Sequence, residues 1–204
     1  MDAVKQIFYA FRDRVESLNG AAPVKGGVSR THQIGLVQFD DNMEEMLPLT
    51  GELDLFESIV DDMKERGRTA IYSAIAEGVR MLTPVFESSP HTDLRILVLT
   101  DGQSNAGIDP EQALRRVNDI GAVVDAIVVG DQPDSNLRKI VAATGGQCFH
   151  IETLSEGFEM MESEGVVSLK GEEEGEERSY PVCCVRCAVC CECGVRCAVC
   201  YVLC

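Results

Sequence analysis

Two polar residues, each at the junction of an apolar element and a loop, have the chemistry of metal ligands. Asp101 follows Thr100 at the end of the nearly all-apolar run Leu94–Leu99, and Thr69 directly precedes a helical pattern that starts at Ala70. Hydroxyl and carboxylate oxygens on separate loops suit Mg²⁺ or Mn²⁺, which accept few protein ligands and retain water molecules. Thr69 and Asp101 are therefore the candidate metal ligands.

Each of these residues also has an ordinary structural explanation. Asp101 and Gly102 form a common turn pair, and Thr69 is a good residue to cap the N-terminus of a helix. Open α/β sheets, however, bind ligands at the carboxyl ends of their strands. The choice between turn and ligand therefore depends on the fold around both residues.

Apolar periodicity predicts strands that alternate with helices. The expected helices cover residues 1–18, 53–64, 70–86, 111–120, 135–143 and 155–161, and the expected strands cover 33–39, 43–49, 94–99, 122–129 and 147–151. Pro48 favours an edge position for the second strand. Alternation of this kind predicts a doubly wound α/β fold, with a mostly parallel sheet covered by helices on both faces.

Four segments of the sequence resemble the von Willebrand factor type A family, in the order and at the separations usual there. They are QIGLVQFDD, GRTAIYSAI, LRILVLTDGQSN and AVVDAIVVG, and the resemblance covers about residues 1–160. It implies a Rossmann-like, non-enzymatic protein-binding module. It also implies a metal-ion-dependent adhesion site, in which a divalent cation bridges to a carboxylate of a partner protein.

In that site, the resemblance matches Thr69 to the threonine of the family motif and Asp101 to its aspartate. Ser104 and Asn105 flank the site without an assigned ligand role, and Asp40 or Asp41 is expected near it. The family's first motif, Asp-x-Ser-x-Ser, does not precede the first predicted helix. The metal site is therefore expected to be partial.

The strand that carries this first motif in the family is missing as well, and in the family it lies between the strands matched here by 33–39 and 94–99. Unpaired buried backbone groups cost about 1–3 kcal/mol each. We therefore expect that the two strands close up, that another segment fills the gap, or that the chain is a truncated copy or incomplete gene model. Truncation is the favoured explanation, with a naturally short form that has lost metal binding as its competitor.

The C-terminal part of the chain differs in composition from the predicted domain, residues 1–165. Residues 166–180 are an acidic linker, and residues 181–204 are a Cys-rich low-complexity tail in which Val-Arg-Cys-Ala-Val-Cys occurs twice. The repeat creates two Cys-x-x-Cys pairs, Cys187/Cys190 and Cys197/Cys200, which are candidate Zn²⁺ ligands. Cysteine acylation at a membrane and a tail without any role are the alternatives.

Charge and cysteine usage narrow the class of partner. The 204 residues carry a formal net charge of −16, which argues against nucleic acid and anionic membrane as partners. A run of about 18 apolar residues, which an ordinary membrane span needs, does not occur. Nine of the ten cysteines lie in the tail, and no secretory leader is visible, so we expect an intracellular, cytoplasmic protein.

Enzymatic function has weak support in the sequence. Cys148 and His150 lie two residues apart on a predicted strand, a spacing that invites a thiol nucleophile, but no third, orienting group is identifiable. His32 and His91 are expected in solvated loops. We therefore predict a protein-binding module that is not an enzyme. The alternatives are a zinc-binding tail on an inert domain and a truncated product without binding activity.

Overall fold

A computed structural model describes residues 2–19, 31–40, 42–62, 69–130, 134–151 and 196–203. The strands are β1 Thr31–Phe39, β2 Met43–Thr50, β3 Asp93–Thr100, β4 Val123–Val129, β5 Cys148–Ile151 and β6 Arg196–Leu203. The helices are α1 Asp2–Asn19, α2 Asp54–Asp62, α3 Ile71–Ser88, α4 Pro110–Ile120 and α5 Ser135–Ala143. These elements confirm the predicted alternation, whereas the predicted helix at 155–161 lies outside the described residues.

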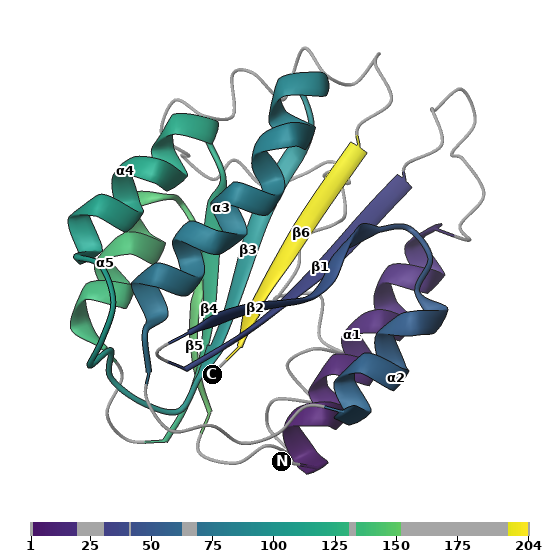
Figure 1. The fold of residues 1–204 in the computed structure, drawn as a ribbon, viewed down its shortest axis with the longest axis horizontal. Coiled ribbons are helices and arrows are strands. Elements are labelled where there is room, and N and C mark those ends of the chain that lie inside the picture. The colour runs from purple at the N-terminus through teal and green to yellow at the C-terminus, as the bar shows by residue number, and fades with distance from the viewer. Residues whose placement is uncertain are drawn as a thin grey trace, which may run out of the picture.

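The six strands form one sheet in the order β2-β1-β6-β3-β4-β5 (Figure 1). The pairs β1/β6, β6/β3, β3/β4 and β4/β5 are parallel, and β2 joins the edge of the sheet antiparallel to β1. Pro48 lies in β2, in agreement with the predicted edge position, where the missing N–H is tolerated. The doubly wound α/β fold is thereby confirmed.

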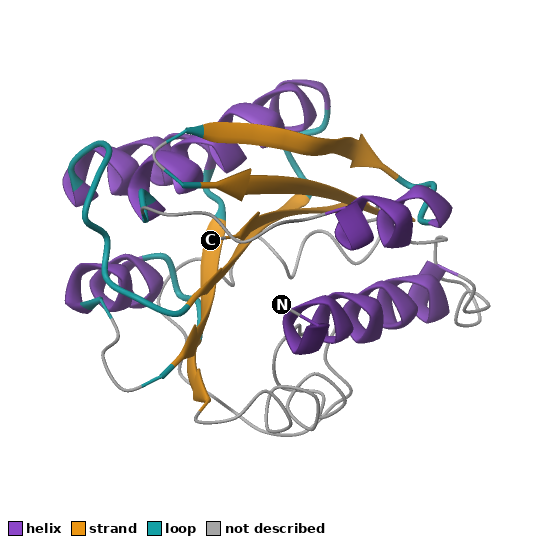
Figure 2. Ribbon diagram, turned by 60° about the horizontal axis from the view of Figure 1, so that its bottom comes forward, coloured by secondary structure: helices purple, strands orange, loops and turns teal. Residues whose placement is uncertain are grey.

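Helices cover both faces of this sheet (Figure 2), and the sheet separates two hydrophobic cores. One core lies under α3, α4 and α5 and includes Val37, Ile75 and Val98. The other lies under α1 and α2 and includes Phe11 and Phe56. Among the described residues, no helix combines the length and apolar character that crossing a membrane requires.

Local sequence explains the boundaries of the elements nearest the site. Pro110 occupies the first turn of α4, where its missing N–H costs nothing, and Gly121 ends that helix with φ of 64°. Pro84 lies inside α3, and the helix continues past it to Ser88. Burial of one face of α3 against the sheet outweighs the backbone hydrogen bond that Pro84 removes.

Strand β6 comes from the C-terminal tail of the chain, yet in the sheet it lies between β1 and β3. Its residues pair with β1 from Thr31 to Gln38 and with β3 from Asp93 to Leu99. One of the expected outcomes for the missing strand was that another segment fills the gap, and the structure shows this outcome. Residues 196–203 thus belong to the sheet, while the linker and the rest of the tail lie outside the described residues.

Asp125, on β4, places a carboxylate inside the sheet and is only 3% exposed. It accepts hydrogen bonds from Nη1 of Arg95, on β3, at 2.8 Å and from the N–H of Gln147 at 2.8 Å. Burial raises the pKa of Asp125, and Arg95 and the Gln147 N–H offset part of that rise. This pair therefore makes a buried charge tolerable at the β3/β4 junction.

Replacement of Asp125 by alanine should lower the free energy of unfolding by about 3 kcal/mol, because it leaves the Arg95 guanidinium and the Gln147 N–H without their acceptor. Urea unfolding followed by circular dichroism measures this loss. The control is Asp93→Ala, because the more exposed Asp93 carboxylate lies 3.6 Å from Nε of Arg95 and should contribute less than about 1 kcal/mol. An equal loss of unfolding free energy in the two variants would contradict the role of Asp125 as the main acceptor for Arg95.

Candidate functional site

The carboxyl ends of the parallel strands meet at one edge of the sheet, and the loops that follow them form the candidate site. Asp40 follows β1, the loop 101–109 follows β3, and Gly130 follows β4. Gly130 has φ of +96°, and a side chain there would come within 3.9 Å of the Asp101 carbonyl oxygen. The ends of β3 and β4 are therefore in close contact.

The backbone of Thr69 fastens the start of α3 to the loop after β3. Its N–H donates to Oδ1 of Asn105 at 3.1 Å, and its carbonyl accepts from the N–H of Asn105 at 2.9 Å and from Oγ of Ser104 at 3.3 Å. The next N–H, that of Ala70, donates to the carbonyl of Asp40 at 3.1 Å. The structure thus brings together the three segments that the sequence analysis placed near the site.

A buried carboxylate, Asp134, ties the same loop to α5 and α3. It caps α5 by accepting from the N–H groups of Asn136 and Leu137 at 2.9 and 3.0 Å. It also accepts from the Ser104 N–H at 3.0 Å and from the hydroxyl of Tyr72. Burial works to raise the pKa of Asp134, but these four donors outweigh it and hold the pKa below its ordinary value.

Gly107 lets the loop pack closely against α3. It has φ of +90°, and a side chain there would collide with Oγ of Ser73. That hydroxyl accepts a hydrogen bond from the Ile108 N–H at 3.0 Å. A larger residue at position 107 would therefore push the loop away from the helix.

Among the described residues at this edge, few oxygen ligands are left for a cation, and Asp41 lies outside those residues. The carboxylates of Asp134 and Asp40 already accept hydrogen bonds, the latter from the Asn42 N–H at 2.6 Å. The Asp101 carboxylate is exposed, whereas Thr69 is buried and bonds to the same loop through its backbone N–H. In the part of the chain that the structure describes, no group of three or more acidic, His or Cys residues could hold a metal. Asp101 and Thr69 stay predictions as ligands, and two side chains alone would be a partial ligand set for a divalent cation.

The model of the von Willebrand factor type A domain matches residues 3–163. The chain belongs to this family. A protein of Acanthamoeba polyphaga mimivirus named as a probable bifunctional E2/E3 enzyme is 27% identical over 176 residues, which cover 82% of the chain and 13% of that protein. The chain thus spans only a small part of this relative's length.

Solved structures of type A domains share the fold. A von Willebrand factor type A protein from Catenulispora acidiphila has a TM-score of 0.57 at 17% identity, over 77% of this chain and 38% of that one. Proximal thread matrix protein 1 from the mussel byssus, with a zinc-occupied adhesion motif, has a TM-score of 0.59 at 22% identity. The match covers 78% of this chain and 42% of that one. These likenesses establish the fold.

The Cys148/His150 pair does not have the properties of a nucleophile and its base in this type A domain. Burial raises the pKa of the Cys148 thiol, although Arg138 works in the opposite direction. A catalytic cysteine instead needs a lowered pKa. The Nε2 atom of His150 faces the carbonyl of Gly130. The geometry therefore favours a packing role for Cys148.

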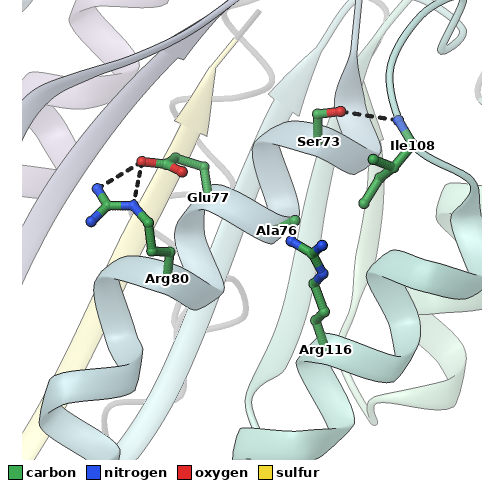
Figure 3. Close-up of a pocket in the computed structure, with 6 residues that line it drawn as sticks. All are labelled: Ser73, Ala76, Glu77, Arg80, Ile108 and Arg116. Carbon is green, nitrogen blue, oxygen red and sulfur yellow. Dashed lines mark hydrogen bonds and ion pairs between the residues drawn. The ribbon is translucent and has the colours of Figure 1, made fainter.

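A hollow of about 180 Å³ lies between α3 and α4 (Figure 3). Its lining includes Glu77 and Arg80, which form an ion pair with each other at 2.7 Å, and Arg116 from the facing helix. Ligand pockets typically reach about 300–1,000 Å³. This hollow is therefore too small for a drug-sized ligand, and its Glu77 and Arg80 charges are already paired.

The sequence named Thr69 and Asp101 as candidate ligands, which stay predictions, and Ser104 and Asn105 as their neighbours, but it missed two other residues that hold the loop in place. Asp134 was not considered, although an aspartate directly before a predicted helix is a recognisable capping signal. The role of Tyr72 has no local signal, because its partner lies 62 positions along the chain. The expectation for His32 was wrong, since β1 begins at Thr31 and His32 is 4% exposed, whereas His91 is exposed as expected.

Substitution of Asp134 by alanine should cost about 2–4 kcal/mol of stability at pH 7, because two buried and two partly buried donors lose a charged acceptor. A lowered pKa means that the ionised form stabilises the fold above the ordinary value near 4 and that this contribution is lost as the pH falls below it. The difference in the free energy of unfolding between Asp134→Ala and the unsubstituted chain should therefore become smaller below about pH 4.

Urea unfolding at a series of pH values from 7 downward measures this effect. Tyr72→Phe is the matched control, since it removes one donor and retains the carboxylate, and it should cost about 1–2 kcal/mol. A loss in Asp134→Ala that stays constant with pH would show that ionisation of Asp134 does not stabilise the domain.

Proposed function

We propose that this chain, whose type A domain belongs to a family of protein-interaction modules, binds another protein through the loops at the carboxyl edge of the sheet. In this proposal, Asp101 and Thr69 hold a divalent cation weakly, and a carboxylate of the partner completes the coordination. Mg²⁺ suits such a site, because it retains water molecules and often binds through one or two protein carboxylates.

One observation carries this proposal. The hydrogen bonds between Thr69 and the segment Ser104–Asn105 fix the two ligand-bearing loops against each other, whereas Asp101 keeps an exposed carboxylate. A ligand held on such a rigid base loses little conformational entropy when it binds. The same geometry supports weak binding by the chain alone, because among the described residues the proposal draws on only two side-chain ligands.

The mimivirus relative named as a probable bifunctional E2/E3 enzyme supports a second, wider proposal. We propose that the segment shared with this chain serves there as a protein-binding unit and not as the part that performs chemistry. Cys148 is the one cysteine whose side chain the structure describes, and burial raises its pKa. This property argues against a thiolate nucleophile at that position.

Addition of Mg²⁺ should stabilise the chain slightly. With a dissociation constant of about 1 mM, 10 mM Mg²⁺ adds about 1.4 kcal/mol, since only the folded state binds the ion. For a domain of this size, this raises Tm by about 3–5 °C. Asp101→Ala should abolish the shift, and Thr69→Val should reduce it.

Differential scanning fluorimetry with and without Mg²⁺ measures these shifts. Asp119→Ala is the control, because Asp119 is an exposed aspartate on α4, outside the candidate site. It should retain the full response. An equal Mg²⁺ response in the Asp101→Ala chain would refute the assignment of the cation to this edge.

A further inference from the structure

The sheet contains a slot between β1 and β3 that only a strand can fill. On one side of it, β6 pairs with β1 from Thr31 to Gln38, and on the other side with β3 from Asp93 to Leu99. Removal of β6 would leave the facing edges of β1 and β3 without partners and divide the sheet into β2-β1 and β3-β4-β5. The slot therefore exposes two backbone edges at once whenever β6 is absent.

The residues that flank the slot require apolar occupants. Position 202 of β6 pairs with Val37 and Val98, both 0% exposed and both in the core under α3. Position 201 pairs with Leu36 and Leu97, which are 0% and 5% exposed and belong to the opposite core. Because paired positions of neighbouring strands share a face, each of these positions of the slot faces one of the two cores.

The repeated hexapeptide provides two segments that could compete for this slot. Residues 186–190 and 196–200 are identical, Arg-Cys-Ala-Val-Cys, but the next three differ. The second copy continues with Tyr-Val-Leu, and the first with Cys-Glu-Cys. In the same register, Glu192 would take the position of Val202, where a buried, unpaired carboxylate is costly. The chemistry of the slot therefore selects the second copy.

We propose that the slot between β1 and β3 is a strand-binding site for residues 196–203, and that it accepts this segment from a second copy of the chain as well as from its own. The donated strand is parallel to both neighbours and is joined to β5 through residues 152–195. Closing so long a connection gives an effective concentration of only about the millimolar range. A second copy competes at high protein concentration, and the product is a strand-exchanged dimer.

Val199→Pro tests whether the strand is needed, because proline removes a ladder N–H from the centre of a strand that is paired on both sides. It should lower Tm by about 10 °C. Val189→Pro is the matched control, since Val189 occupies the same place in the first hexapeptide copy, and it should leave Tm unchanged. Equal Tm values for Val199→Pro and the unsubstituted chain would overturn the proposal.

Synthetic peptides test the selectivity of the slot under reducing conditions. A peptide of residues 196–203, added to the Val199→Pro chain, should restore most of the lost Tm, whereas a peptide of residues 186–193 should not. The 186–193 peptide with Glu192→Val should restore part of it. If Val199→Pro does not fold alone, the same peptides are present during refolding from urea and the recovered near-ultraviolet circular dichroism is measured. Equal rescue by the first two peptides, or rescue by neither, would overturn the proposal.

The exchange between copies has its own readout. The unsubstituted chain, refolded at millimolar concentration, should yield a dimer in light scattering after size-exclusion chromatography, and Val199→Pro should not. Rapid hydrogen exchange of residues 196–203 in the intact chain, or a dimer that forms equally in both proteins, would count against strand donation.

Discussion

The structure depends on the backbone pairing of β6 with its two neighbours. Neighbouring strands lie about 4.8 Å apart, so the inserted strand holds the ends of β1 and β3 about 10 Å from each other. The site is built across this separation. Ala70 bonds to Asp40 at the end of β1, and Thr69 bonds to Asn105 in the loop after β3, so the start of α3 joins the two sides. Direct pairing of β1 with β3 would bring these anchors too close together for the same bonds.

Hydrogen bonds, and not free charges, determine the shape of the binding edge. Ser104, Asn105 and Asp134 all use their polar groups to hold loops, and the lowered pKa of Asp134 reports how well its carboxylate is satisfied. The edge is therefore rigid, and the Asp101 carboxylate is exposed on it. A site of this kind contributes geometry, whereas most of the affinity for a partner must come from the partner's own groups.

The parts of the fold that could be predicted are those with local signals. Leu94–Leu99 is apolar enough to require burial on both faces, and Pro110 and Gly121 bracket α4. The position of Asp101 directly after a buried strand was enough to name it as a candidate metal ligand. The network of Tyr72 and Asp134 could not be predicted, because it joins side chains distant in sequence. The burial of His32 was missed because β1 begins two residues before the expected start.

The role of β6 was hidden by its cysteines, which suggested a metal site or a low-complexity tail. Unpaired cysteine behaves as a small hydrophobic residue, and Cys-Ala-Val-Cys-Tyr-Val-Leu is then an acceptable buried strand. Positions 197 and 200 are three apart, so in β6 they belong to opposite faces of the sheet. To bind one zinc ion together, both sulfur atoms must lie about 2.3 Å from that ion. Cys197 and Cys200 therefore cannot bind one zinc ion together while they lie in β6, whereas zinc binding by other cysteines of the tail stays a prediction.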